Sequence, residues 1–134
     1  MSLMSVAYVG NLRTEAVHLD SNNQIKTDAP KDNQGQGEAF SPTDLLCTSL
    51  ASCMLTIAAM KARTLGVEFE GVSVQLQKKM QANPRKVSEI VLTFDWKGLD
   101  QRISADHLEQ LKQAALSCPV ALSLDSSVVK TMVW

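Results

Sequence analysis

The sequence predicts an α+β fold in which a mainly antiparallel sheet packs around a long central helix. Residues 45–60 form an uncharged, apolar run, and segments with apolar residues at every second position lie on both sides of it. A shorter amphipathic segment follows. The run is shorter than the roughly 20 residues that a membrane-spanning helix needs. With 134 residues, the chain has the length of one compact domain, and we expect a single domain over residues 1–134.

The N-terminal part is expected to form a hairpin followed by a loop. Apolar residues alternate around Gly10 and Asn11, which is typical of two short strands joined by a turn. Residues 28–39 contain a proline, an asparagine and two glycines without apolar periodicity. This composition predicts a long loop, and long loops inside compact domains are usually functional or mobile.

The long helix is predicted to begin after Ser41 and to end near Leu65. Ser41 can cap the first turn, Pro42 suits the first helical position, and Asp44 suits the positive end of the helix dipole. Gly66 is a typical stop signal. Because this helix is apolar nearly all round, one sheet covers only part of it, and we expect a second copy of the chain to cover the rest. The sequence therefore predicts a homodimer.

The C-terminal part predicts two strands, two helical segments and a last strand. Apolar and polar residues alternate over residues 67–76 and 87–96, which indicates an antiparallel pair. Residues 104–117 repeat apolar residues at helical spacing. A second helical turn is expected over residues 118–124 and a strand over residues 126–134.

Charge and motif content exclude several classes of protein. Thirteen basic and fourteen acidic residues give a net charge of −1 without a long block of either sign, so neither nucleic acid nor a membrane is an expected partner. The N-terminus lacks the pattern of a signal peptide, and a cytoplasmic location is expected. The three cysteines, His18 and His107 lack the paired spacing of a zinc site. We therefore expect no metal and no other cofactor.

The cysteines allow either a structural or a chemical interpretation. Cys53 falls on one apolar stripe of the long helix, with Leu46, Leu50, Ile57 and Met60. This pattern favours a buried packing position, because cysteine is among the most buried residue types. Cys47 lies about 120° around the helix from Cys53 and is interpreted as structural. Cys118 precedes Pro119, where a helical cap favours a thiolate. The residues alone leave both interpretations of Cys53 and Cys118 open.

Two segments together resemble a known family. They are GEAFSPTDLLCTSLASCM, residues 37–54, and LSCPVALSL, residues 116–124. A proline-led apolar helix that carries a cysteine, followed downstream by Cys-Pro, resembles the OsmC/Ohr family of osmotically inducible and organic hydroperoxide resistance proteins. The likeness is greater to the OsmC-like branch. It implies an intertwined homodimer with active sites at the subunit interface.

The same resemblance implies a thiol-dependent peroxidase that reduces organic hydroperoxides. Cys53 would be the peroxidatic thiol and Cys118 the resolving thiol, and an external thiol or dithiol would reduce the resulting disulfide. Arg13, the only arginine before the long helix, would stabilise the thiolate of Cys53. The substrate pocket is expected to be lined by Leu50, Met54 and Ile57.

One position departs from the family pattern. Peroxide-reducing members carry a glutamate directly after the helix-start proline, where it pairs with the arginine, whereas here Pro42 is followed by Thr43. Glu38 and Asp44 are the possible substitute carboxylates. Thr43 favours the alternative of a noncatalytic, stress-associated OsmC-like dimer that binds a small apolar ligand. A structural dimer with unreactive cysteines is a third interpretation.

Overall fold

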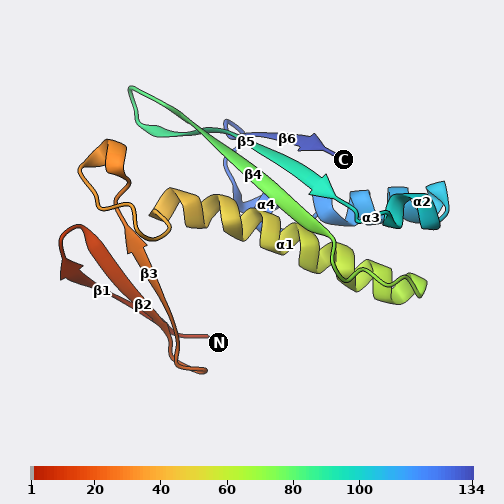
Figure 1. Cartoon of the computed structure of the whole chain (residues 1–134), viewed down its shortest axis with the longest axis horizontal. Helices are drawn as coiled ribbons and strands as arrows, with labels where there is room; N and C mark the ends of the chain where they lie inside the picture. Colours follow the sequence, from red (N-terminus) through yellow and green to blue (C-terminus); the bar gives the residue numbers. More distant parts are fainter. Residues whose placement is uncertain (1) are drawn as a thin grey trace. The chain divides into compact units, whose positions relative to one another are not determined.

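The computed structural model describes residues 2–134, which belong to two compact units (Figure 1). The first unit ends at Leu46 and the second runs from Cys47 to Trp134. In chain order the elements are β1 (Met4–Gly10), β2 (Arg13–His18), β3 (Asn23–Asp28), η1 (Lys31–Asn33), α1 (Pro42–Leu65), β4 (Ser73–Gln81), β5 (Lys86–Asp95), α2 (Leu99–Arg102), α3 (Ala105–Leu116), α4 (Pro119–Ser123) and β6 (Val129–Val133). The predicted α+β class is confirmed.

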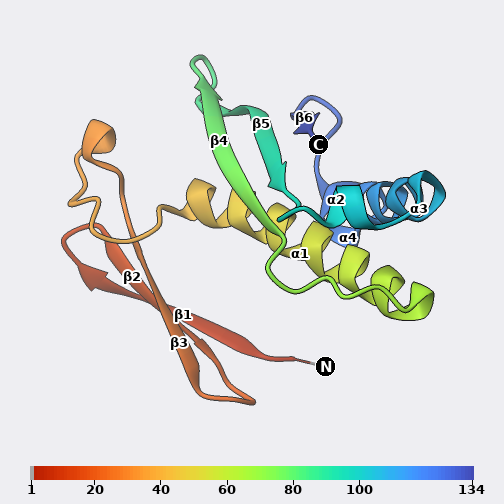
Figure 2. The same cartoon turned by 45° about the vertical axis from the view of Figure 1, so that its right-hand side comes forward.

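The first unit contains an antiparallel sheet with the order β1-β2-β3 (Figure 2). The predicted hairpin is confirmed, and its turn places Gly10, Asn11 and Leu12 in the left-handed region, with φ of 94°, 54° and 58°. Glycine and asparagine adopt this region more easily than other residues do. A third strand, β3, pairs with β2 and ends at Asp28, opposite Arg13.

One face of this first sheet is apolar but exposed. Val6 lies opposite Ala16, and Ala16 lies opposite Ile25, so the three side chains share a face. The most exposed apolar residues of this face are Met4 at 70%, Val6 at 68%, Tyr8 at 67% and Ile25 at 48%. Contiguous apolar surface of this kind commonly marks an interaction site.

Helix α1 begins and ends where the sequence predicts. The Ser41 hydroxyl accepts a hydrogen bond from the Asp44 backbone N–H, and the Asp44 carboxylate accepts one from the Ser41 backbone N–H, both at 3.0 Å. This reciprocal pair is a capping box, which satisfies amide groups that the first helical turn leaves free. Gly66 follows the last helical residue with a φ of 71°.

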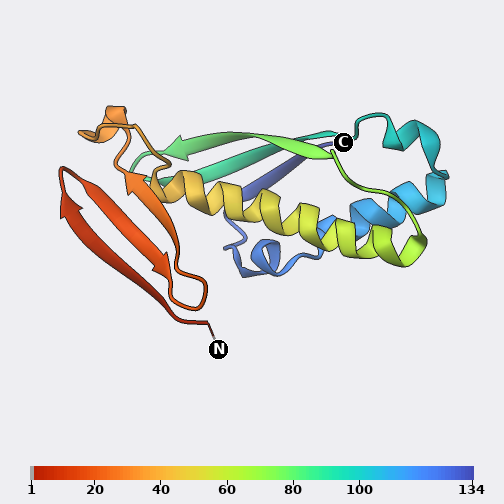
Figure 3. The same ribbon diagram turned by 60° about the horizontal axis from the view of Figure 1, so that its bottom comes forward.

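The second unit places a mixed three-stranded sheet along α1 (Figure 3). Strands β4 and β5 are antiparallel, as predicted, but β6 runs parallel to β5. The strands of the chain thus divide between two sheets. Strand β4 begins at Ser73, and residues 67–72 form an irregular segment rather than the start of a strand. Val67, Phe69 and Val72 in this segment pack against the core, which explains their alternation.

The buried stripe of α1 differs from the predicted one. Its buried residues are Cys47, Leu50, Ala51, Met54, Ala58 and Ala62, whereas Leu46 and Met60 are 38% and 58% exposed. Residues from the sheet and from α3, among them Ile90, Leu92 and Leu111, complete this core. Because the helix is apolar nearly all round, its periodicity does not select one face, and the packing of the second unit decides which residues are buried.

By length and composition alone, α1 is apolar enough to cross a membrane. All six of its buried residues belong to the core of the second unit, and the core helix of a compact domain shows the same length and composition.

Candidate active site

The second unit brings two of the predicted site residues together. Cys53 lies in the middle of α1 and is partly exposed, whereas Cys118 directly precedes α4 and is fully buried. Both belong to one packed core, and their thiols are close enough that Cys53 contributes to the raised pKa of Cys118. All three cysteines of the chain are free thiols. Two neighbouring reduced thiols can form a disulfide when one of them is oxidised.

Cys118 is the N-cap of α4, as the sequence predicts. Pro119 is the first helical residue, and the Cys118 Sγ accepts a hydrogen bond from the backbone N–H of Ala121 at 3.4 Å. Burial nevertheless raises the pKa of the Cys118 thiol, and the neighbouring Cys53 raises it further. The backbone hydrogen bonds at the cap lower this pKa, in the direction that the sequence analysis expects, but the loss of solvation outweighs them.

Cys47 lies on the buried stripe of α1 and is 2% exposed. It packs in the core of the second unit, in agreement with its structural interpretation. Cys53 lies outside this stripe and is less buried than the sequence indicates.

Arg13 makes a two-point ion pair with Asp28 in the first unit. The Arg13 Nε donates to Asp28 Oδ1 at 2.7 Å, and Arg13 Nη2 donates to Asp28 Oδ2 at 2.8 Å. Asp28 is 1% exposed, and its Oδ2 also accepts a hydrogen bond from the backbone N–H of Glu38 at 3.0 Å. The hydrogen bond from Arg13 holds the pKa of the Asp28 carboxyl below its usual range. The same pair raises the pKa of Arg13.

The two expected substitute carboxylates have different environments. Glu38 Oε2 lies 3.3 Å from Arg13 Nη2, and its side chain is 69% exposed. Asp44 contributes its carboxylate to the capping box with Ser41. Thr43 shares a hydrogen bond with Ser41 at 3.2 Å between the two hydroxyl oxygens.

Sequence reasoning missed Asp28 as a site residue. It assigned residue 28 to the start of a loop, whereas Asp28 is the last residue of β3 and pairs in register with Arg13. Asp28 could be recognised in the sequence as a carboxylate at the end of the strand that follows the hairpin, in which Arg13 lies. Neighbouring strands place such residues side by side.

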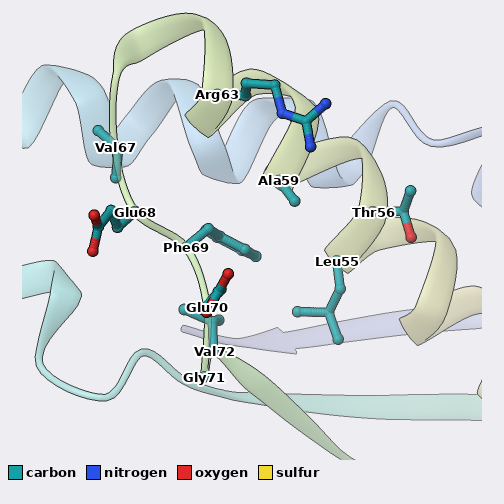
Figure 4. A pocket seen from close by; sticks show the side chains of 10 residues that line it. All are labelled: Leu55, Thr56, Ala59, Arg63, Val67, Glu68, Phe69, Glu70, Gly71 and Val72. Carbon is teal, nitrogen blue, oxygen red and sulfur yellow. The ribbon is translucent and has the colours of Figure 1, made fainter.

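The residues expected to line the substrate pocket lie mainly in the core. Leu50 and Met54 have no exposed surface, and Ile57 is partly buried against the same core. A cavity of about 590 Å³ instead lies between α1 and residues 67–72 (Figure 4). Its lining includes Leu55, Ala59 and Phe69, and it includes neither cysteine of the thiol pair.

Within residues 2–134, no group of three or more His, Cys, Asp or Glu side chains could hold a metal ion. His18 Nδ1 shares a hydrogen bond with the Ser21 hydroxyl at 2.7 Å. His107 lies in the first turn of α3. The arrangement of the described side chains thus centres on a thiol pair in one unit and an arginine–carboxylate pair in the other.

Comparison with solved structures finds the same fold in proteins from several bacteria. A protein from Psychrobacter arcticus 273-4, named as an osmotic stress induced and detoxification response protein, is 47% identical with a TM-score of 0.92; the alignment covers 99% of this chain and 95% of that chain. The organic hydroperoxide resistance protein OsmC from Legionella pneumophila is 18% identical with a TM-score of 0.76, over 99% and 95% of the two chains. An OsmC-like protein of unknown function from Vibrio cholerae is 15% identical with a TM-score of 0.79, over 99% of both chains.

Among curated proteins, none matches the chain. The family model for the OsmC-like proteins matches residues 35–132, which include α1, the thiol pair and the second sheet up to Met132 of β6. The sequence motifs, the fold, the relative at 47% identity and this match agree, and the chain belongs to the OsmC-like protein family.

Proposed function

We propose that this protein is a thiol-dependent peroxidase that reduces organic hydroperoxides through a two-cysteine cycle. The observation that carries the proposal is that Cys53 and Cys118 are neighbours in one packed core, close enough for Cys53 to influence the pKa of Cys118. A buried cysteine that serves only as packing needs no thiol neighbour, whereas a peroxidatic cysteine needs a second thiol within reach to form a disulfide.

The cycle has three steps. The Cys53 thiolate attacks one oxygen of the hydroperoxide, the O–O bond breaks, and the leaving oxygen takes a proton and departs as an alcohol while Cys53 becomes a sulfenic acid. The Cys118 thiol then attacks the sulfenic sulfur, which forms a disulfide and releases water. Two equivalents of an external thiol, or one dithiol, return both cysteines to the reduced state by exchange.

The burial of the two thiols supports the assignment of their roles. Cys53 is the partly exposed member of the pair, so a peroxide reaches it more easily. Cys118 is fully buried, and its raised pKa keeps it protonated at neutral pH. The attack on a peroxide requires a thiolate, so Cys118 is poorly suited to the first step. We therefore assign the first step to Cys53 and the second to Cys118.

Arg13 and a second copy of the chain complete the proposed site. A thiolate on an apolar helix needs positive charge nearby, and we assign this role to Arg13. The exposed apolar face of the first sheet supports a homodimer. Apolar surface of this kind is commonly covered by a partner, and we assign that role to a second copy of the chain. The structural relative from Legionella pneumophila is named as an organic hydroperoxide resistance protein, which supports the substrate class.

A thiol titration before and after one equivalent of tert-butyl hydroperoxide tests the proposal. Three thiols per chain are expected before treatment and one, Cys47, afterwards. The Cys53→Ser variant should retain both of its thiols under the same treatment. If all three thiols of the unaltered protein survive excess hydroperoxide, the cycle is absent, and the noncatalytic, ligand-binding dimer becomes the better interpretation.

A further inference from the structure

We propose that Asp28 is the positioning residue of Arg13, in the place of the carboxylate that Thr43 cannot supply. The inference rests on the proposed function, because it takes Arg13 as the group that stabilises the Cys53 thiolate. It assigns to Asp28 the role of the carboxylate that pairs with Arg13, for which the sequence analysis names Glu38 and Asp44 as candidates.

The geometry of the ion pair fixes the guanidinium in one orientation. Asp28 receives Nε at 2.7 Å and Nη2 at 2.8 Å, which is the two-point arrangement that matches the planar groups of arginine and a carboxylate. Two parallel hydrogen bonds prevent the guanidinium from rotating about its long axis. A lysine at position 13 would keep the charge but lose this fixed orientation.

The side-on approach of Asp28 leaves one end of the guanidinium available. Nε and Nη2 are both bonded to Asp28, and Nη2 also reaches Glu38. Within residues 2–134, Nη1 of Arg13 makes no hydrogen bond. Its two N–H groups are therefore free to donate to a thiolate or to an oxygen of the substrate.

Asp28 is itself held in place by the backbone. Its carboxylate accepts a hydrogen bond from the backbone N–H of Glu38 at 3.0 Å, and the Asp28 backbone N–H donates to the carbonyl of Phe40 at 3.1 Å. With 1% exposure, the side chain is shielded from competing water. A carboxylate with this many donors stays ionised and stays in one position.

Neither alternative carboxylate can do the same. Glu38 offers a single contact at 3.3 Å from a side chain that is 69% exposed, and exposed ion pairs contribute little. Asp44 is engaged with the backbone of Ser41 at the start of α1. Asp28 is thus the carboxylate on which the orientation of Arg13 depends.

The test compares Asp28→Asn, Arg13→Gln and the double variant. Two rates are measured on each: alkylation of Cys53 by iodoacetamide, located by peptide mass spectrometry, and loss of tert-butyl hydroperoxide. Asp20→Asn is the matched control, because Asp20 is an exposed aspartate of the same unit that makes no ion pair with any residue among 2–134. Circular dichroism and thermal unfolding establish that each variant is folded.

We expect Asp28→Asn to slow both rates by between about tenfold and about a hundredfold, which is the cost of a small misplacement of a catalytic group. Glu38→Gln should have a smaller effect, and Asp20→Asn should react as the unaltered protein does. If Asp28 acts through Arg13, Asp28→Asn should cause no further loss in the Arg13→Gln background. If Asp28 has only a structural role, the double variant should show the product of the losses of the two single variants, and this result would overturn the proposal. Unchanged rates in Asp28→Asn would also overturn it.

Arg13→Lys tests the same idea if Asp28→Asn does not fold. It keeps both charges, and the loss should match that expected for Asp28→Asn; a rate equal to that of the unaltered protein would overturn the proposal. Failure of the proposed function gives a different result. In that case the unaltered protein does not consume hydroperoxide, while the alkylation rates still report whether Asp28 and Arg13 act on Cys53.

Discussion

Cys118 is fully buried and neighbours Cys53, although a sheet hairpin and two helices separate the two residues in the chain. The two cysteines come together within the second unit, where α1 and the segment before α4 pack in one core. It places a partly exposed thiol next to a protonated, buried one. The following predictions test what this pair and its surroundings do.

The first prediction concerns the intermediate of the cycle. In Cys118→Ser, the oxidised Cys53 lacks its partner thiol and should remain a sulfenic acid, which dimedone captures. Mass spectrometry should find the adduct at Cys53 and not at Cys47, which is 2% exposed. An adduct yield that is the same with and without Cys118 would contradict the role of Cys118 as resolving thiol.

The second prediction follows from the raised pKa of Cys118. Disulfide formation needs the thiolate of Cys118, and the fraction of thiolate increases as the pH approaches the pKa from below. Because burial holds this pKa above the ordinary cysteine value of about 8.5, the rate of disulfide formation should still increase between pH 8 and pH 9. Rapid-mixing measurements after a pulse of hydroperoxide would record the rate of disulfide formation at each pH. A rate that is constant above pH 7 would show that Cys118 titrates lower.

The third prediction concerns the positive charge. Arg13→Ala should slow the alkylation of Cys53 by iodoacetamide at neutral pH, because less of Cys53 would be present as thiolate. Cys47 in the same protein provides an internal reference, since it is 2% exposed in the core of the second unit, to which Arg13 does not belong. An unchanged Cys53 rate would remove Arg13 from the site.

The fourth prediction tests whether Leu50 on α1, which is expected from the sequence to line the substrate pocket, is a packing residue of the core. Leu50 is fully buried, so Leu50→Ala should lower the free energy of unfolding by about 2 to 5 kcal/mol. Leu122→Ala removes the same atoms from a side chain that is 75% exposed. This substitution should change the free energy of unfolding by less than about 0.5 kcal/mol. Urea unfolding measures both. Equal effects of the two substitutions would mean that Leu50 is not a packing residue.

The fifth prediction concerns the exposed apolar face of the first sheet. Val6→Glu places a charge on that face and should shift a dimer towards monomer in sedimentation experiments. Ser5→Glu is the matched control, because neighbouring residues of a strand point to opposite faces. If the unaltered protein sediments as a monomer at micromolar concentration, the proposed homodimer is wrong.

The sequence by itself determined the class of fold and the limits of α1. Ser41, Pro42, Asp44 and Gly66 act through hydrogen bonds and backbone angles that involve only their near neighbours, so their effect is readable from the chain. The same holds for the hairpin turn at Gly10 and for the cap that Cys118 makes on α4. The paired motifs around Cys53 and Cys118 also identified the family.

Only the tertiary structure decided which face of α1 is buried and how the charged groups pair. An all-round apolar helix carries no periodic signal, so burial of Met54 and exposure of Met60 depend on what packs against each side. The pKa of Cys118 depends on a competition between burial and local hydrogen bonds, and burial comes from residues distant in the chain. Asp28 meets Arg13 because β2 and β3 pair in one register, and strand register is a property of the folded sheet rather than of either segment.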